Sequence, residues 1–182
     1  MSRRACPPDP TPASSRHNVL MIREATTEDA AAIAALYNPY VRDTVITFEY
    51  DEVAVEVMGA RIAAVQEREL PWIVLEEADA VVGFAYAAPY RPRAAYLHSV
   101  ETTIYLAGEA GGRGLGRALY GDLIERLEAS HAHSAISLIA LPNDASVGLH
   151  HALGFRDVGV LHEVGRKFDR WIDVAYLQRP LV

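Results

Sequence analysis

Residues 100–129 read VETTIYLAGEAGGRGLGRALYGDLIERLEA, and their pattern indicates the class of fold. Its β-branched first part, residues 100–106, predicts a strand, and a glycine cluster follows it. The helix expected next, over about 115–129, carries an apolar residue at every fourth position: Leu115, Leu119, Leu123 and Leu127. An apolar strand at 134–141 comes after the helix. The centre of the chain therefore predicts a strand, loop, helix and strand unit whose helix covers one face of a sheet.

Strands and helices continue on both sides of this unit. Residues 72–75 and 81–86 read as two strands joined by a short acidic turn, so we expect an antiparallel hairpin. Two further strands are expected near 158–164 and 171–177. A helix at about 144–153 would end at Gly154, the residue type favoured just past a helix end.

Two helices are expected before the hairpin. Thr26 and Asp29 have the spacing of a capping box ahead of the first helix, and a short strand around Ile22 precedes them. The first helix would bury Ile33, Leu36 and Tyr37. The second, at about 52–66, would bury four residues at mixed three- and four-residue intervals: Val53, Val57, Ile62 and Val65.

Composition restricts the class of protein. A chain of 182 residues, half of them hydrophobic, fits one globular domain, and it has no apolar run of the ~18 residues that a membrane-spanning helix needs. A net charge of −7 argues against a nucleic-acid partner. The lone cysteine, Cys6, can form neither an intrachain disulfide nor a multi-cysteine metal site, so we expect a cytoplasmic protein without a metal.

The first twenty residues differ in composition from the rest. They contain four prolines and little apolar periodicity, so we expect residues 1–20 to be a disordered tail and residues 21–182 to form the domain. Arg3 and Arg4 are not followed by the apolar stretch of an export signal. Met21 is a candidate alternative start to Met1.

The glycine loop, residues 111–117 (GGRGLGR), sits between a predicted strand and a predicted helix. Glycines in this position let backbone N–H groups approach an anion at the positive end of the helix. The Gly-Lys-Ser/Thr of a Walker A loop is absent, and so is the carboxylate that a dinucleotide fold places at the end of its second strand. Holding the pyrophosphate of an acyl-CoA is the third interpretation, and a simple turn is the fourth.

The order of short motifs from Met21 onward resembles the GNAT N-acetyltransferase superfamily, and within it the branch that acetylates phosphinothricin and methionine sulfoximine. The motifs are Ile22-Arg23-Glu24-Ala25, Tyr37-Asn38, Thr47-Phe48-Glu49, Arg91-Pro92-Arg93, Tyr96, Val100-Glu101, the glycine loop, Asn143 with Ser146, Leu149-His150, Leu153-Gly154-Phe155, Gly165-Arg166-Lys167-Phe168, Trp171 and Asp173. None is specific alone, but their order and spacing together are.

The resemblance implies an α/β fold, a mixed and mostly antiparallel sheet flanked by helices and splayed where acetyl-CoA binds. It also implies a homodimer. The cofactor would contact the splayed strand, the glycine loop and the end of the next strand, through Ile104, Tyr105, Leu106, Gly112, Arg113, Gly114, Leu115, Gly116, Arg117 and Asn143. One position departs from the superfamily, which commonly has Arg or Gln where this chain has Gly111, so we expect weaker or rearranged cofactor binding.

The same resemblance assigns the chemistry. Glu101 stands where the family places its carboxylate base, and His150 where many members carry a tyrosine acid. A solvent-facing glutamate and a packing histidine are the alternatives, and Tyr120 reads as a core residue. Arg91 and Arg93, two positions apart, would project together and clamp a substrate carboxylate. Tyr96 and Phe48 would complete the substrate pocket. The alternatives are a solvated basic loop for the two arginines and a core position for Phe48.

The sequence therefore predicts an acetyl-CoA-dependent N-acetyltransferase whose substrate is a small amino acid such as phosphinothricin, methionine sulfoximine or methionine sulfone. Acetylation of another small amine or of a peptide N-terminus is an alternative. A binding module that senses acyl-CoA is a second alternative, because it would need the glycine loop but not Glu101.

Overall fold

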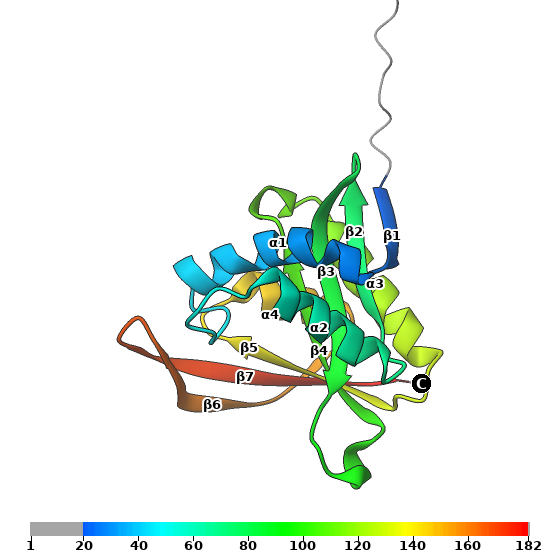
Figure 1. Ribbon diagram of the computed structural model, residues 1–182. Coiled ribbons are helices and arrows are strands. Elements are labelled where there is room, and N and C mark those ends of the chain that lie inside the picture. The colour runs from blue at the N-terminus through cyan, green and yellow to red at the C-terminus, as the bar shows by residue number, and fades with distance from the viewer. Residues whose placement is uncertain (1–19, 182) are drawn as a thin grey trace, which may run out of the picture.

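A computed structural model describes residues 20–181 and contains a seven-stranded sheet in the order β1-β2-β3-β4-β5-β7-β6 (Figure 1). The strands are β1 Leu20–Glu24, β2 Trp72–Glu77, β3 Ala80–Pro89, β4 Ser99–Leu106, β5 Ser134–Ala140, β6 Arg156–Lys167 and β7 Arg170–Pro180. The α-helices are α1 Ala30–Asp43, α2 Val55–Gln66, α3 Leu115–Glu128 and α4 Asp144–Ala152, and short 3₁₀ turns are η1 Thr27–Asp29, η2 Ala94–Tyr96 and η3 Gly108–Ala110. The expected tail lies outside the described residues, except that Leu20 begins β1.

The sheet is mixed and mostly antiparallel, as expected. β4 and β5 are its parallel pair, and the chain passes between them through α3. The other neighbouring strands run antiparallel, including the β2–β3 hairpin. The central strand, loop, helix and strand unit is therefore confirmed.

Helices cover both faces of the sheet, with α1 and α2 on one face and α3 and α4 on the other (Figure 1). Because side chains alternate along a strand, β4 presents its residues to both layers. Tyr105 meets Tyr37 of α1, with ring centroids 5.0 Å apart, whereas Thr102 meets Tyr120 of α3. Glu101 and Thr103 share the parity of Tyr105, which places them on the α1–α2 face.

The stripe predicted for α3 is confirmed, since Leu115, Leu119, Leu123 and Leu127 are all buried. One assignment in the second helix was wrong. Val57 is 47% exposed, and the buried residues of α2 are Met58, Ile62 and Val65. The apolar residues of this segment surround the helix, so their spacing alone did not identify the buried face.

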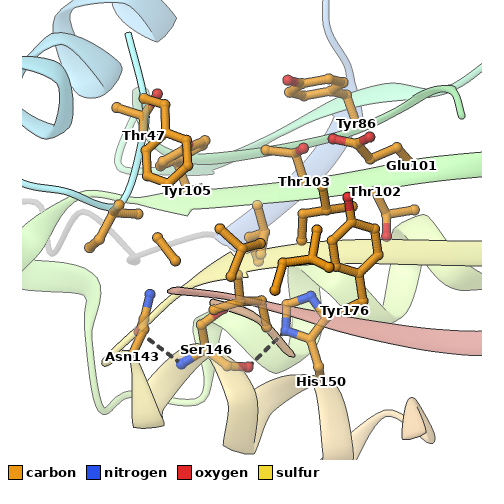
Figure 2. Close-up of a pocket in the computed structure, with 18 of the residues that line it drawn as sticks. Thr47, Tyr86, Glu101, Thr102, Thr103, Tyr105, Asn143, Ser146, His150 and Tyr176 are labelled. Atoms are coloured by element: carbon orange, nitrogen blue, oxygen red, sulfur yellow. Dashed lines mark hydrogen bonds between the residues drawn. The ribbon is translucent and has the colours of Figure 1, made fainter. Parts of the chain in front are cut away.

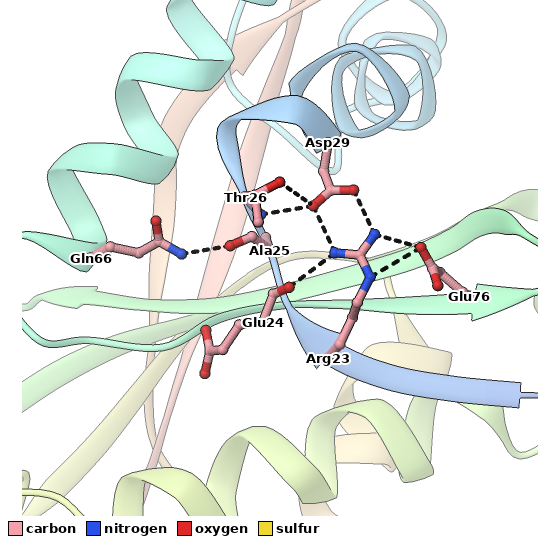
Figure 3. Close-up of polar contacts among 7 residues, drawn as sticks. All are labelled: Arg23, Glu24, Ala25, Thr26, Asp29, Gln66 and Glu76. Carbon is pink, nitrogen blue, oxygen red and sulfur yellow. Dashed lines mark hydrogen bonds and ion pairs between the residues drawn. The ribbon is translucent and has the colours of Figure 1, made fainter.

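The start of α1 is held by a polar network centred on Arg23 of β1 (Figure 3). Asp29 closes the predicted capping box by accepting from Thr26 N at 2.7 Å, and both carboxylate oxygens of Asp29 accept from Arg23, at 2.7 and 2.8 Å. Arg23 also donates to Glu76 of β2. These bonds lower the pKa of Asp29 below its ordinary 3.8 and tie β1, β2 and α1 together.

Candidate active site

The two parallel strands separate in the middle of the sheet. β4 and β5 pair over three positions, from Ser99↔Ser134 to Glu101↔Ile136, although both strands continue beyond them. On its other side, β4 stays paired with β3 as far as Leu106. Past Glu101, the edge of β4 that faces β5 is therefore open, and an open strand edge can accept an extended ligand as if it were another strand.

Three hydroxyl groups meet where the strands diverge, and we call Thr102, Tyr120 and Ser137 the fork cluster. Thr102 Oγ1 lies 2.7 Å from Tyr120 Oη and 2.8 Å from Ser137 Oγ, and the last two atoms are also 2.8 Å apart. Burial raises the pKa of Tyr120 to about 12. The interpretation of Tyr120 as a core residue fits this placement, and the cluster ties β4, β5 and α3 together at the fork.

A cavity of about 420 Å³ opens in front of the fork (Figure 2). Strand β4 contributes a continuous run of its lining, residues 101–105, and Phe48 and Asn143 also line it. In Figure 2, Glu101, Tyr86 and Thr103 lie on one side of the cavity, and Asn143, Ser146 and His150 lie on the other. The structure thus brings six of the predicted site residues to one cavity: Phe48, Glu101, Ile104, Tyr105, Asn143 and His150.

Glu101 is the carboxylate of this cavity. It is half-buried, and burial raises its pKa above the ordinary 4.5, while the positive charge of Arg91 opposes the increase. The raised pKa means that the folded protein holds this carboxylate with a stronger affinity for protons than a free glutamate has. A desolvated carboxylate at the point where a sheet opens is suited to accept a proton from a bound group.

His150 is placed less favourably for catalysis than the sequence suggested. It is 3% exposed, its Nδ1 donates to the carbonyl of Ser146 at 2.7 Å, and burial lowers its pKa. Its ring packs against Tyr120 and Phe155, at centroid distances of 4.8 and 5.1 Å. A neutral imidazole whose N–H is already committed has no proton to give, so this geometry favours the packing alternative.

The glycine loop leaves open space at the start of α3. Gly112 and Gly114 have φ values of +73° and +79°, a left-handed backbone that other residues adopt only with strain. A Cβ built on either glycine would meet no atom within 4 Å, so there is open space above the loop. Gly114 also caps α3, a helix of 14 residues whose N-terminal dipole end favours negative charge.

The other predicted residues of the loop have mixed surroundings. Leu115 is buried, and Gly116 lets α3 approach β4, because a Cβ there would lie 3.1 Å from Leu106 Cδ1. Arg117 is exposed on the first turn of α3. Arg113 forms an ion pair with Glu77 of β2, with Nη1 and Oε2 2.8 Å apart. Arg113 is therefore directed toward β2 in this structure.

Two predicted cofactor contacts, Leu106 and Asn143, already form one hydrogen bond each within the protein. The Leu106 carbonyl accepts from Tyr40 Oη of α1, which leaves Ile104 and Tyr105 as the middle of the open edge. Asn143 caps α4 by accepting from Ser146 N at 3.2 Å, and its amide nitrogen points away from the cap (Figure 2). The amide is therefore held in one orientation with its N–H₂ group available.

The predicted carboxylate clamp is only partly brought to the cavity. Arg91, Arg93 and Tyr96 line a separate hollow of about 500 Å³ in the β3–β4 connection. Arg91 lies over the Tyr90 ring at 4.9 Å, and its charge interacts with Tyr176, which lines the main cavity. The charge of Arg91 acts on the pKa of Glu101, so Arg91 is the arginine linked to the site.

Sequence reasoning did not assign three of the tyrosines that line the cavity to the site. Tyr37, Tyr86 and Tyr176 all line it, and burial is the main reason that the pKa values of the first two are raised, that of Tyr37 to about 12. One signal was present in the sequence. Strand alternation puts Thr103 and Tyr105 on the face that bears Glu101, and an antiparallel neighbour would add Tyr86 to the same group.

Two structural absences can be stated for residues 20–181. They contain no group of three or more His, Cys, Asp or Glu side chains placed to hold a metal ion. No helix among them is long and apolar enough to cross a membrane.

Comparison with known proteins agrees with this geometry. Residues 22–176 match the acetyltransferase (GNAT) domain family. The chain is 43% identical to a phosphinothricin N-acetyltransferase of Streptomyces coelicolor over 89% of this chain and 96% of that protein. It is 34% identical to an L-methionine sulfoximine/L-methionine sulfone acetyltransferase of Pseudomonas aeruginosa, over 88% and 94% of the two chains.

A solved structure shows the same fold with a ligand. The phosphinothricin acetyltransferase of Sinorhizobium meliloti, in complex with acetyl-CoA, superposes with a TM-score of 0.86 at 36% identity, and the match covers 89% of this chain and 88% of that one. The resemblance read from the motifs is thereby confirmed. The chain belongs to the GNAT family and is an acetyl-CoA-dependent acetyltransferase.

Proposed function

We propose that this chain acetylates the α-amine of a small amino acid or analogue of the phosphinothricin, methionine sulfoximine or methionine sulfone kind. The observation that carries the proposal is the position of Glu101, the last β4 residue paired with β5, whose desolvated carboxylate lines the cavity at the fork. The names of the two curated relatives support the substrate class.

The residues around the fork fit acetyl-CoA. The open edge at Ile104 and Tyr105 would hold the extended arm, and the left-handed Gly112 and Gly114 would present backbone N–H groups to the pyrophosphate. Asn143 would contact the arm from the end of β5. Leu106, Leu115, Gly116 and the charges of Arg113 and Arg117 complete the predicted contacts. Gly111 has no side chain that could add one.

When bound, acetyl-CoA supplies an acetyl thioester, which is the activated acyl group of the reaction. An α-amine with a pKa of ~8 or above is largely protonated at neutral pH, so it must lose a proton before it can attack. Glu101 accepts that proton through a water molecule, and its raised pKa makes it a better acceptor than an exposed glutamate. A backbone N–H of the open β4 edge stabilises the charge that develops on the acetyl oxygen.

The departure of the thiolate needs little acid assistance, because a thiol of this kind has a pKa of ~8.5. This is consistent with the neutral His150, whose Nδ1–H is bonded to the Ser146 carbonyl. His150 then serves to pack α4 against Tyr120. Arg91 would bind the substrate carboxylate at the edge of the cavity, with Arg93 and Tyr96 in the adjoining hollow, and Phe48 would form the wall beside the substrate side chain.

We also propose a cytoplasmic homodimer. Support for the dimer comes from exposed apolar side chains on the β6–β7 hairpin, where Val158 is 63%, Phe168 52% and Trp171 61% exposed. Several exposed apolar side chains on one hairpin are consistent with an interaction surface. The acidic composition and single cysteine support the cytoplasmic location.

The deciding experiment replaces the base and keeps the site otherwise intact. Glu101→Gln should lower kcat by roughly 10²–10⁴ at neutral pH while the affinity for acetyl-CoA, measured by calorimetry, stays unchanged. Its rate should increase with pH through the pKa of the amine, because hydroxide then supplies the neutral amine. Glu125→Gln, on the exposed side of α3, is the matched control and should behave as the parent.

The outcomes separate the alternatives. A parent that binds acetyl-CoA but acetylates no amine would identify a binding module. Activity on peptide N-termini exceeding that on free amino acids would replace the proposed substrate class. Equal rates and pH profiles for parent and Glu101→Gln would remove Glu101 from the proton path.

A further inference from the structure

The wall of the cavity formed by Phe48 depends on a glycine that does not itself line the cavity. A Cβ built on Gly165 of β6 would lie 2.2 Å from Phe48 Cε2 and 2.3 Å from Phe48 Cζ. The Phe48 ring therefore rests directly on the backbone of Gly165. Gly165 does not have a left-handed φ, so steric room for the ring, and not backbone conformation, is what its missing side chain provides.

The residues after Gly165 hold the chain on either side of Phe48. Lys167 Nζ donates to the Thr47 carbonyl at 2.8 Å and to the Val41 carbonyl at 2.7 Å. The Arg166 carbonyl accepts from Tyr50 Oη. Successive residues of β6 thus fix the backbone before Phe48, its ring, and the side chain that follows two positions later.

Burial singles out the same short segment. Most of β6 is exposed, but Gly165 and Lys167 at its end are buried, and Lys167 is 1% exposed. They share one face of the strand, because they lie two positions apart. A register shift between Leu161 and Gly165 in the β6–β7 pairing precedes them. Such bulges redirect side chains beside binding sites.

We infer that residues 165–167 are a specificity-determining element: they position the Phe48 ring and thereby set which amino-acid side chains the cavity admits. The inference rests on the proposed function and adds the residues that decide among its substrates. A methyl group at position 165 forces the ring to move, and any movement changes the wall of the cavity. Phe48 is 38% exposed, so its ring can shift without disrupting the core.

The test uses two alanine substitutions in the same strand of the full chain. Gly165→Ala creates the contact with Phe48, whereas Gly159→Ala is the matched control, because a Cβ there meets nothing within 4 Å. Acetylation is measured for a series of amino acids that differ in side-chain length. Gly165→Ala should change the ratio of kcat/KM between long and short substrates by about tenfold, mainly through KM. Neither variant should change the affinity for acetyl-CoA.

A double-mutant cycle shows whether the effect passes through Phe48. In a Phe48→Ala background, Gly165→Ala should change the substrate ratio by no more than about twofold, the usual limit for independent sites. The double variant lacks the ring that would meet the new methyl group, so it also serves if Gly165→Ala alone is unstable. Failure of both to fold would assign Gly165 to the fold and overturn the inference.

The results distinguish this inference from the proposed function. A parent enzyme inactive on every amino acid would refute the proposed function. An active parent whose substrate ratios are the same in Gly165→Ala and Gly159→Ala would leave that function standing and refute the role of residues 165–167. An equal effect of Gly165→Ala with and without Phe48 would also refute it.

Discussion

Lys167 is the only lysine in the chain, and it is buried. We predict that Lys167→Met makes the protein less stable by about 2–4 kcal/mol. The substitution keeps the length of the side chain but leaves the carbonyls of Val41 and Thr47 without their donor. Each lost bond to a charged donor costs roughly 1.5–3 kcal/mol, and removing a buried ammonium from the folded state offsets part of the sum.

The measurement is urea unfolding followed by circular dichroism, with thermal unfolding beside it. For a domain of this size, the expected loss corresponds to a decrease of about 5–15 °C in Tm. Arg170→Met is the matched control, because it removes an exposed cation from the same hairpin. Equal stabilities of the two variants would show that the two carbonyl bonds contribute no net stability, and the argument from burial would then be wrong.

Three further predictions concern other parts of the structure. Tyr120→Phe should cost about 0.5–1.5 kcal/mol in urea unfolding, because the other two hydroxyls of the fork cluster keep their mutual bond, and a loss above ~3 kcal/mol would contradict this. Asp29→Asn should cost about 1–3 kcal/mol at neutral pH. The pKa of Asp29 is lowered from 3.8, so the difference in stability between Asp29→Asn and the parent should disappear as the pH falls through the pKa that Asp29 has in the folded protein. Urea unfolding at a series of acidic pH values tests this. Arg91→Ala removes the cation that opposes the increase in the pKa of Glu101, so that pKa should rise further. Carbon-13 NMR of the Glu101 carboxyl group measures the change, and a decrease in the pKa would refute the coupling.

Local patterns predicted the elements well where one face of an element is clearly apolar. The four leucines of α3 and the capping box at Thr26 depend on neighbours within one or two turns, and both were confirmed. Val57 was assigned wrongly because α2 is apolar around much of its circumference. The face that a helix buries is then decided by the surface it packs on, here α1 and β2.

The site was less predictable, because distant segments build it. Glu101, Asn143 and the glycine loop were identified through motifs whose order is characteristic of a family. Tyr86 belongs to no such motif and enters the cavity only through its pairing with Thr103 across the β3–β4 ladder. Arg91 and Arg93 are two positions apart, as in any extended segment, so their spacing does not show which of them approaches Glu101. The fold of their loop brings the charge of Arg91 close enough to act on the pKa of Glu101.

The fork itself shows why strand propensity cannot locate a site of this kind. β4 and β5 both continue past Glu101 and Ile136 with ordinary strand sequences, so nothing in either one marks the end of their pairing. Three hydroxyl groups from two strands and a helix meet at that point, and a buried hydroxyl must find partners. The fork cluster ties β4 and β5 together directly after their last paired residues, Glu101 and Ile136, and the open edge of β4 begins beyond it. The place where the open edge begins is therefore marked by tertiary contacts among residues 102, 120 and 137, and the spacing of these residues in the sequence does not reveal that they meet.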